Sequence, residues 1–443
     1  MPLDPLRLTL DNGMTVVAKE TRTTPAVTLL VGLRAGAFYD PDGREGTAAL
    51  VARVLDRGTR TRSAADIADA LDGRGASLSV VAGRHQVMVS ATCLAEDFRT
   101  ICSLVADIIQ RPAFDEREVT TRRGDLLTSI LQDEDDPAAV AVDSLMARLY
   151  PDHPYGRRAR GTAATVEQLW RADLIEFHSK WFTPETALLA VVGDVNPEDA
   201  VVTASEEFES WNMNRAIEPV LSAPSPPRAR ELSVVPMMSK AQADVAYGFL
   251  GLRRSDPDYY AGWVMNNALG QYALGGRLGD SIRERQGMAY YVYSTLDASL
   301  AEGPMMIRAG VAAENVQRTL STIDKELESL LSDGVSVKEF DESKRYLIGS
   351  IPRQLETNAS IAGFLLSSEF YELGIDYDAR LPALISDVTL EDVNAVARRL
   401  IDPQKAVVVV AGPWQGPNTG EAMILSVSHP SAAPAVSQSK DLL

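Results

Sequence analysis

Cysteine, long apolar runs and an excess of positive charge are all missing from this sequence of 443 residues. With only Cys93 and Cys102, in a strand-like and a helix-like stretch, a disulfide framework is excluded and two buried thiols are expected. No run of about 18 apolar residues occurs, so no membrane span is predicted. Acidic residues outnumber Lys and Arg by 61 to 43, which gives a formal net charge of -18. This balance argues against nucleic acid as a partner and is compatible with basic peptides.

Histidine is also scarce, and no histidine has the neighbours of a metal ligand. None has a second histidine three or four residues away or lies in a cysteine or acidic cluster. We therefore expect structural or solvated side chains at His85, His153, His178 and His429. The G-x-S-x-G elbow, the P-loop and a dinucleotide-binding glycine turn after a strand are absent as well. The sequence thus contains no catalytic motif that stands by itself.

The N-terminus, MPLDPLRLTLDNG, has neither the basic nor the apolar region of a secretory signal. If the chain starts as given, a cytoplasmic protein is expected. If a signal peptide has been removed, the periplasm is the alternative, so the sequence leaves the compartment open.

The order of predicted elements repeats at about half the chain length. The elements expected in the first half are a hairpin at 6–20, strands at 26–35, 76–81, 86–92 and 188–193, and helices at 46–57, 63–71, 95–110, 115–132 and 166–180. Those expected in the second half are strands at 241–252, 289–299 and 304–312, helices at 259–269, 277–286, 316–332 and 336–350, and a final helix and buried strand in DVTLEDVNAVARRLIDPQKAVVVVAG. We infer an internal duplication.

Local signals define some of the turns and helix starts. The Asn-Gly pair at 12–13 predicts a tight hairpin turn, because both residues tolerate positive φ angles. Thr165 with Gln168, and Ser336 with Glu339, have the spacing of capping boxes, in which two side chains bond the backbone at a helix start.

Strand runs alternating with helical runs predict an α+β fold. Each half is expected to be an antiparallel sheet flanked by helices. The predicted domain organisation is an N-terminal half at 1–215, a linker at 216–231, a C-terminal half at 232–415 and a tail rich in Pro, Ser and Ala at 416–443.

The stretch GGRLGDSIRERQGMAYYVY predicts a corner between a helix and a strand. The helix is expected to stop at Gly287, and a strand of alternating large residues follows. Arg283 and Tyr290 lie just before and just after this corner, where a guanidinium and a phenol can hold a peptide backbone. Tyr291 and Tyr293 are expected to be packing residues or neighbours.

Three stretches carry local patterns that occur together in one enzyme family: LRAGAFYDPDGREGTAALVARVLDRGT, LQDEDDPAAVAVDSLMARLYPDHPYGRRARGT and GGRLGDSIRERQGMAYYVYS. They resemble, in this order, the H-x-x-E-H zinc helix, the stretch after the third zinc ligand and the arginine/tyrosine motif of the insulinase/pitrilysin zinc peptidases. That family includes mitochondrial processing peptidase and its two-chain bacterial relatives. The resemblance covers nearly the whole chain and implies a clamshell of two α/β-sandwich halves.

The sequence departs from the family at the metal site. Alignment with the zinc helix puts Ala49, Ala52 and Arg53 at the positions of the two histidines and the glutamate base, and the third ligand falls at Thr128 or Ser129. Zinc needs deprotonated lone pairs, which a guanidinium and two methyl groups do not provide. The chain itself is therefore expected to bind no cofactor, and zinc is expected in a partner subunit.

The resemblance implies that Arg283 and Tyr290 act in trans. In two-chain members these residues bind the substrate and support the transition state at the partner's zinc. The chain is then the inactive subunit of a heterodimeric metalloendopeptidase that cleaves unfolded peptides, with a homologous H-x-x-E-H chain as its partner. The alternatives are a structural subunit without catalytic function and a peptide-binding homodimer without proteolysis.

Overall fold

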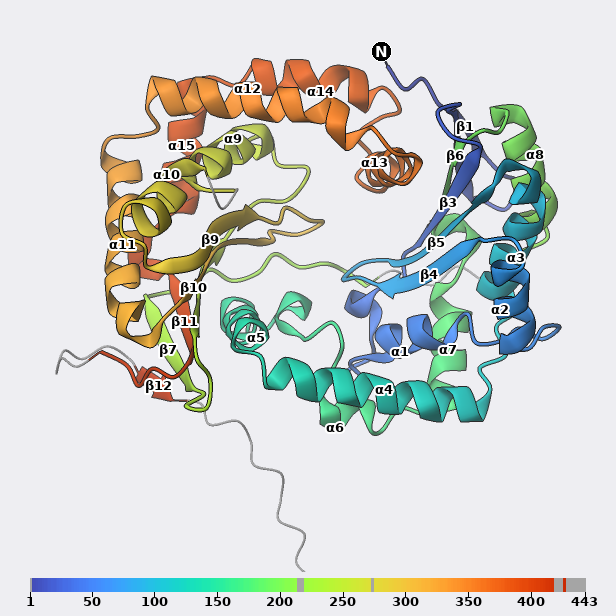
Figure 1. Ribbon diagram of the computed structural model, residues 1–443, viewed down its shortest axis with the longest axis horizontal. Helices are drawn as coiled ribbons and strands as arrows, with labels where there is room; N and C mark the ends of the chain where they lie inside the picture. Colours follow the sequence, from blue (N-terminus) through green and yellow to red (C-terminus); the bar gives the residue numbers. More distant parts are fainter. Residues whose placement is uncertain (1, 213–218, 272–274, 418–424, 428–443) are drawn as a thin grey trace, which may run out of the picture.

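The computed structural model describes residues 2–212, 219–271, 275–417 and 425–427. Two six-stranded sheets stand at opposite sides of the molecule, and helices cover the outer side of each (Figure 1). The strands of the first sheet are β1 (Leu6–Thr9), β2 (Thr15–Glu20), β3 (Ala26–Leu33), β4 (Ser77–Ala82), β5 (Val87–Leu94) and β6 (Ala187–Gly193). Those of the second are β7 (Glu231–Pro236), β8 (Ala243–Leu250), β9 (Ala289–Leu296), β10 (Pro304–Val311), β11 (Val407–Gly412) and β12 (Leu425–Val427).

Five strands of each sheet have the same order, which confirms the predicted duplication, whereas the sixth strands, β1 and β12, do not correspond. The first runs β1-β2-β6-β3-β5-β4 and the second β12-β7-β11-β8-β10-β9. Most neighbours are antiparallel, as expected, but β2 runs parallel to β6 and β7 runs parallel to both β11 and β12. Each sheet is therefore mixed, because β6 returns beside β2, and β11 beside β7, after a long crossover. The strand β12 comes from the predicted tail, and residues 219–230 of the predicted linker form neither helix nor strand.

Helices follow the strands in both halves. The first half contains α1 (Thr47–Val54), α2 (Ala64–Asp72), α3 (Phe98–Gln110), α4 (Glu116–Glu134), α5 (Pro137–Leu149), α6 (Ala163–Val166), α7 (Arg171–Trp181) and α8 (Pro197–Phe208). The second contains α9 (Tyr259–Leu269), α10 (Gly276–Leu278), the π-helix η5 (Gly279–Glu284), α11 (Val316–Ser332), α12 (Val337–Gln354), α13 (Asn358–Phe370), α14 (Tyr377–Ser386) and α15 (Leu390–Leu400). Short 3-10 turns are η1 (Ala37–Tyr39), η2 (Ala95–Asp97), η3 (Pro154–Gly156), η4 (Pro184–Thr186), η6 (Ala313–Asn315) and η7 (Pro403–Lys405).

Two local predictions were wrong. The predicted helix at 166–180 is two helices, α6 and α7, and the cap of α6 pairs Thr162 with Thr165 instead of Thr165 with Gln168. The predicted hairpin of β1 and β2 is present, and the amide of Leu10 closes its turn on the carbonyl of Met14 (2.8 Å), but only Gly13 has a positive φ (+92°) and Asn12 does not. The Asn12 side chain is used elsewhere, since its Nδ2 donates to the carbonyl oxygen of Phe208 at the end of α8 (2.7 Å). The capping box of Ser336 and Glu339 at the start of α12 is confirmed.

Each half contributes one helix to the inner face of the other half's sheet. The helix α5 packs across β8 and β11, and Leu145 and Leu149 are buried there against Ala246 and Val409. The helix α13 packs across β3 and β6, where Ile361 is buried in the same cluster as residues of the first sheet. Figure 1 shows both helices between the two sheets. The halves are thus joined by a reciprocal exchange of helices as well as by the connecting chain.

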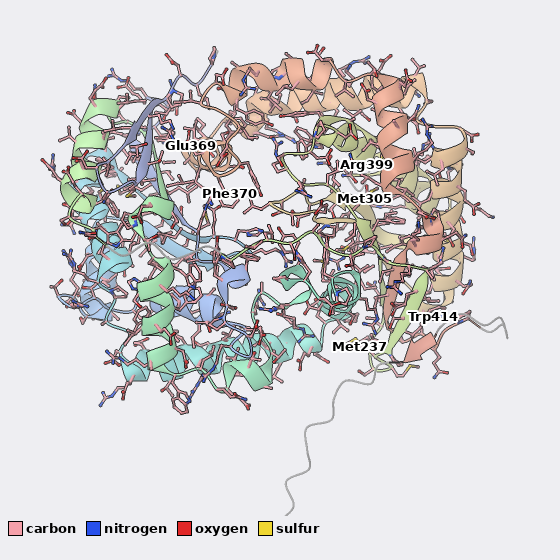
Figure 2. All side chains as sticks on the ribbon, turned by 180° about the vertical axis from the view of Figure 1, so that it is seen from behind. Met237, Met305, Glu369, Phe370, Arg399 and Trp414 are labelled. Carbon is pink, nitrogen blue, oxygen red and sulfur yellow. The ribbon has the colours of Figure 1, made fainter. Side chains whose placement is uncertain are left out.

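The end of α13 is tied to the first half by polar contacts. Glu369 accepts a hydrogen bond from Nε of Arg7 (2.9 Å), and the guanidinium of Arg34 lies 5.5 Å from the ring centre of Phe370. Both labelled side chains, Glu369 and Phe370, can be followed in Figure 2. At the start of α13, Nδ2 of Asn358 donates to the carbonyl oxygen of Ala26 (2.9 Å). The helix is therefore anchored to the first half at both ends.

Candidate functional site

The predicted corner between helix and strand is present, with a different helix type. Residues 279–284 form a π-helix, in which the amide of Arg285 donates to the carbonyl of Asp280 (2.9 Å). Gly287 has a φ of +60° and closes the corner with a hydrogen bond to the carbonyl of Arg283 (3.0 Å). The strand β9 then begins at Ala289. Single π-helical turns are rare and often lie at functional sites, so this geometry sets the corner apart from ordinary helix ends.

Arg277 fixes the start of this corner to α12. Its Nε and Nη2 bond the two carboxylate oxygens of Glu339 (2.6 and 2.8 Å), and Nη2 also bonds the carbonyl of Gly334 (2.6 Å). The same carboxylate accepts hydrogen bonds from the backbone amide and the hydroxyl of Ser336 (2.8 and 2.7 Å). Burial raises the pKa of Glu339, but the hydrogen bonds from Arg277 and Ser336 outweigh it and lower the pKa to about 2.

This network should weaken in acid. The pKa of Glu339 is lower in the folded than in the unfolded chain, so its contribution to stability is complete above about pH 4.5 and is lost as the pH falls toward 2. We expect the difference in unfolding free energy between the wild type and Glu339→Gln to narrow by about 1 kcal/mol between pH 6 and pH 3.5. Urea unfolding of both proteins at the two pH values measures it. A constant difference would show that Glu339 titrates normally.

Tyr290 lies in a β-bulge on an edge strand. The register between β9 and β10 pairs Tyr291 with Gly310 and then Ala289 with Val311, so Tyr290 has no partner in the ladder. Its side chain is 77% exposed. A bulge re-aims the side chain of the extra residue, and bulges are over-represented beside active sites. The fold therefore presents this phenol at the surface of the corner.

Arg283 is in the last turn of η5 and its side chain is 36% exposed. Its ion pair with Glu284 is long, with 4.0 Å between nitrogen and oxygen. The guanidinium is thus available to a further hydrogen-bond acceptor. Tyr291 and Tyr293, expected to be packing residues or neighbours of the pair, also make hydrogen bonds with a buried ion pair on β8 and β10.

The positions that the resemblance assigns to the zinc site lie on α1 and α4, which pack against each other. Nη2 of Arg53 donates to Oγ of Ser129 (3.2 Å), which itself donates to the carbonyl of Asp125 (3.0 Å). Ala52 is buried, whereas Thr128 is exposed and bonds only its own helix. Of the two candidates for the third position, Ser129 is the one that faces α1.

These side chains do not fit a zinc ion. A guanidinium, a hydroxyl and two methyl groups supply none of the three deprotonated protein ligands that catalytic zinc requires. Within residues 2–212, 219–271, 275–417 and 425–427, no group of three His, Cys, Asp or Glu side chains could hold a metal ion.

Sequence reasoning missed Asp40, which holds the start of α1. Its carboxylate accepts the amides of Gly46 and Ala48 (2.7 Å each), and Gly46 has a φ of +99°. Burial raises the pKa of Asp40 to about 7. No helix-cap pattern identifies Asp40 in the sequence, because the N-cap residue is Gly46 and Asp40 lies outside the helix start.

The described histidines are structural, as predicted. His85, His153 and His178 are buried, and their ring nitrogens bond a phenol hydroxyl or backbone carbonyl oxygens at 2.7 to 3.0 Å. Burial lowers the pKa of each, to about 4 for the first and the third. His429 lies outside the described residues.

The two thiols are also buried, as predicted. Cys93 and Cys102 form no disulfide bond, and burial raises their pKa values to about 11 and about 12. Such thiols are protonated at neutral pH, so they are unreactive. None of the described helices is both long and apolar enough to cross a membrane.

Comparison with known proteins identifies the family. Residues 15–163 match the family described as "Insulinase (Peptidase family M16)", and residues 168–347 match the "Peptidase M16 inactive domain". An uncharacterized zinc protease of Mycobacterium tuberculosis is 31% identical over 417 residues, which cover 92% of this chain and 93% of that protein. The chain belongs to the insulinase family.

Solved structures and a more distant relative agree with this family. A peptidase M16 inactive domain from Pseudomonas fluorescens superimposes with a TM-score of 0.86 at 28% identity, covering 93% of this chain and 98% of that one. A Helicobacter pylori protein named "Non-peptidase homolog YmxG" is 22% identical and covers 86% of this chain and 87% of its own length. The clamshell of two sandwich halves expected for an insulinase-family chain is therefore the fold observed.

Proposed function

We propose that this chain is the subunit without zinc of a two-chain metalloendopeptidase, and that it brings Arg283 and Tyr290 to the active site of its partner. One contrast supports the proposal. At the positions assigned to the zinc ligands, Arg53 is hydrogen-bonded to Ser129, whereas the corner has a phenol that is 77% exposed and a guanidinium that is 36% exposed. The chain therefore has no zinc ligands at these positions, but it has hydrogen-bond donors at the corner that can bind a peptide.

The two donors suit peptide hydrolysis. The planar guanidinium of Arg283 can donate two parallel hydrogen bonds to carbonyl oxygens of an extended substrate. The hydroxyl of Tyr290 can donate to the carbonyl oxygen that becomes negative in the transition state. Donors held in place before the reaction stabilise that charge without a reorganisation cost. A site of this kind reads backbone groups, so it suits unfolded peptides of varied sequence.

The partner in this proposal is a homologous chain with an intact H-x-x-E-H helix, which provides the zinc and the glutamate base. Membership of the insulinase family and the match of residues 168–347 to its inactive domain support such a partner. A purely structural subunit would have no use for an unpaired tyrosine presented on a bulge. The exposure of Tyr290 therefore favours the peptidase subunit over that alternative.

Mixing the two chains tests the proposal. The isolated chain should contain no zinc by atomic emission and should not cleave a quenched fluorescent unfolded peptide. Adding a genomically neighbouring H-x-x-E-H chain should produce a stable complex and cleavage. The control is the same partner with the motif glutamate replaced by glutamine, which should give a complex without cleavage. Zinc bound by the isolated chain, or a partner whose activity does not depend on this chain, would contradict the proposal.

A further inference from the structure

Tyr291, the residue next to Tyr290, reaches across the second sheet to a third strand. It pairs with Gly310 on β10, which in turn pairs with Asp244 on β8, so the three residues form a row on one face. Gly310 has no side chain in the way, and a methyl group there would lie 2.6 Å from Cε1 of Tyr291. The ring therefore passes over Gly310, and its hydroxyl donates to the carboxylate of Asp244.

Arg308 completes this arrangement and joins it to the other half. Its Nη2 bonds Oδ1 of Asp244 (3.0 Å) and the carbonyl oxygen of Ala138 (3.1 Å), which is in the first turn of α5. The side chains of Arg308 and Asp244 are only 19% and 7% exposed. Hydrogen bonds to buried charged groups are among the stronger ones in proteins. Tyr291 is thus held by a buried ion pair that also bonds the exchanged helix of the first half.

This contact fixes one side of the bulge. Ala289, on the other side, is buried in the core of the second half, so Tyr290 lies between two anchored residues. A strand that loses such an anchor can move its bulge or slip by one residue, which turns side chains to the other face of the sheet.

We infer that Tyr291, Asp244 and Arg308 form a brace that keeps Tyr290 in its outward position. The three are positioning residues, and their effect on catalysis rests on the function proposed above. Because Arg308 bonds α5, the brace also makes the position of Tyr290 depend on the docking of the two halves.

Hydrogen exchange of the isolated chain tests the brace without any activity. Tyr291→Phe removes one oxygen and leaves the ion pair of Asp244 and Arg308 in place, so the chain should fold. This variant loses the hydrogen bond from the hydroxyl of Tyr291 to the charged Asp244. We therefore expect the amides in the segment 289–291 to exchange with solvent at least about tenfold faster. Gly310→Ala, which places a methyl group in the path of the Tyr291 ring, should also speed the exchange.

The matched control is Tyr293→Phe. The hydroxyl of Tyr293 makes only a long hydrogen bond with Arg308 (3.4 Å), so its removal should leave the exchange unchanged. Unchanged exchange in both Tyr291→Phe and Gly310→Ala would overturn the inference.

A double-mutant cycle in the two-chain complex tests the consequence. Tyr291→Phe should lower kcat about tenfold with KM nearly unchanged, and should have no further effect in a chain that already carries Tyr290→Phe. Independent, additive losses would contradict the brace, because a general structural defect does not act through Tyr290. If Tyr290→Phe alone leaves activity unchanged, the catalytic role proposed for Tyr290 fails, and the exchange experiment still decides whether the brace exists.

Discussion

Replacing Arg283 with alanine, or Tyr290 with phenylalanine, should lower kcat/KM of the two-chain peptidase by about 100- to 1,000-fold. Each change removes a hydrogen-bond donor that we assign to the substrate backbone or to the oxyanion. Loss of an oxyanion donor appears mainly in kcat, whereas loss of a backbone contact made equally in the ground state appears in KM. Steady-state cleavage of a quenched fluorescent peptide, with both chains at fixed concentration, separates the two parameters.

A neighbouring arginine provides the control for this experiment. The side chain of Arg285 is 62% exposed and pairs with Asp280 (2.9 Å) on the same corner. An exposed ion pair contributes little free energy, and we assign Arg285 no contact with the substrate. Arg285→Ala should therefore change kcat/KM by no more than about twofold. Size-exclusion chromatography and zinc analysis of the complex show whether assembly is intact in all variants. Full activity of both Arg283→Ala and Tyr290→Phe in intact complexes would remove the role that we give to the corner.

The largest loss of stability is expected from Leu145→Ala. Leu145 lies on α5 and is fully buried. It packs so closely on β8 that a methyl group added at Gly248 would lie only 2.8 Å from Cδ2 of Leu145. Truncation leaves a cavity where the helix of one half lies on the sheet of the other. Such substitutions cost about 3 to 5 kcal/mol when the surroundings cannot collapse. Urea unfolding followed by circular dichroism measures the loss.

The exposed leucine of the preceding helix is the matched control. Leu131, near the end of α4, has 59% of its surface exposed, so Leu131→Ala should change the unfolding free energy by less than about 0.5 kcal/mol. A loss below about 1 kcal/mol for Leu145→Ala would show that the contact between α5 and the second sheet is loose. Equal losses for both leucines would contradict the packing argument, because alanine is the better helix former and helix propensity cannot destabilise either variant.

The duplication could be predicted because the order of elements repeats, and each half ends in a helix followed by a buried apolar strand and a glycine, as in VVVVAG at 407–412. The helices α5, α8, α13 and α14 were missed, although two of them carry readable starts. Asp136 before Pro137 and Asn196 before Pro197 both cap helices. What sequence pattern cannot give is the exchange of α5 and α13, because an apolar helix face does not specify which of two similar sheets it will cover.

The site was predictable only to the level of its motif. The spacing of Arg283 and Tyr290 identified the corner, but the bulge depends on the register between β9 and β10, which a single strand does not encode. The contact of Tyr291 with Asp244 joins residues on two strands that are not neighbours in the sheet. Likewise, the pairing of Arg53 with Ser129 required the packing of α1 on α4 to decide between two adjacent residues.

The exchange of helices also constrains how the chain can be made. During synthesis, the last strand of the first sheet is complete at Gly193, but α13, which covers the inner face of that sheet, ends only at Phe370. At translation rates of about 5 to 20 residues per second, the inner face waits on the order of 10 to 30 s for its cover. Apolar side chains such as Val17 and Val192 stay open to water and to other nascent chains in that interval. The first half therefore emerges from the ribosome with its own sequence complete and the inner face of its sheet still uncovered.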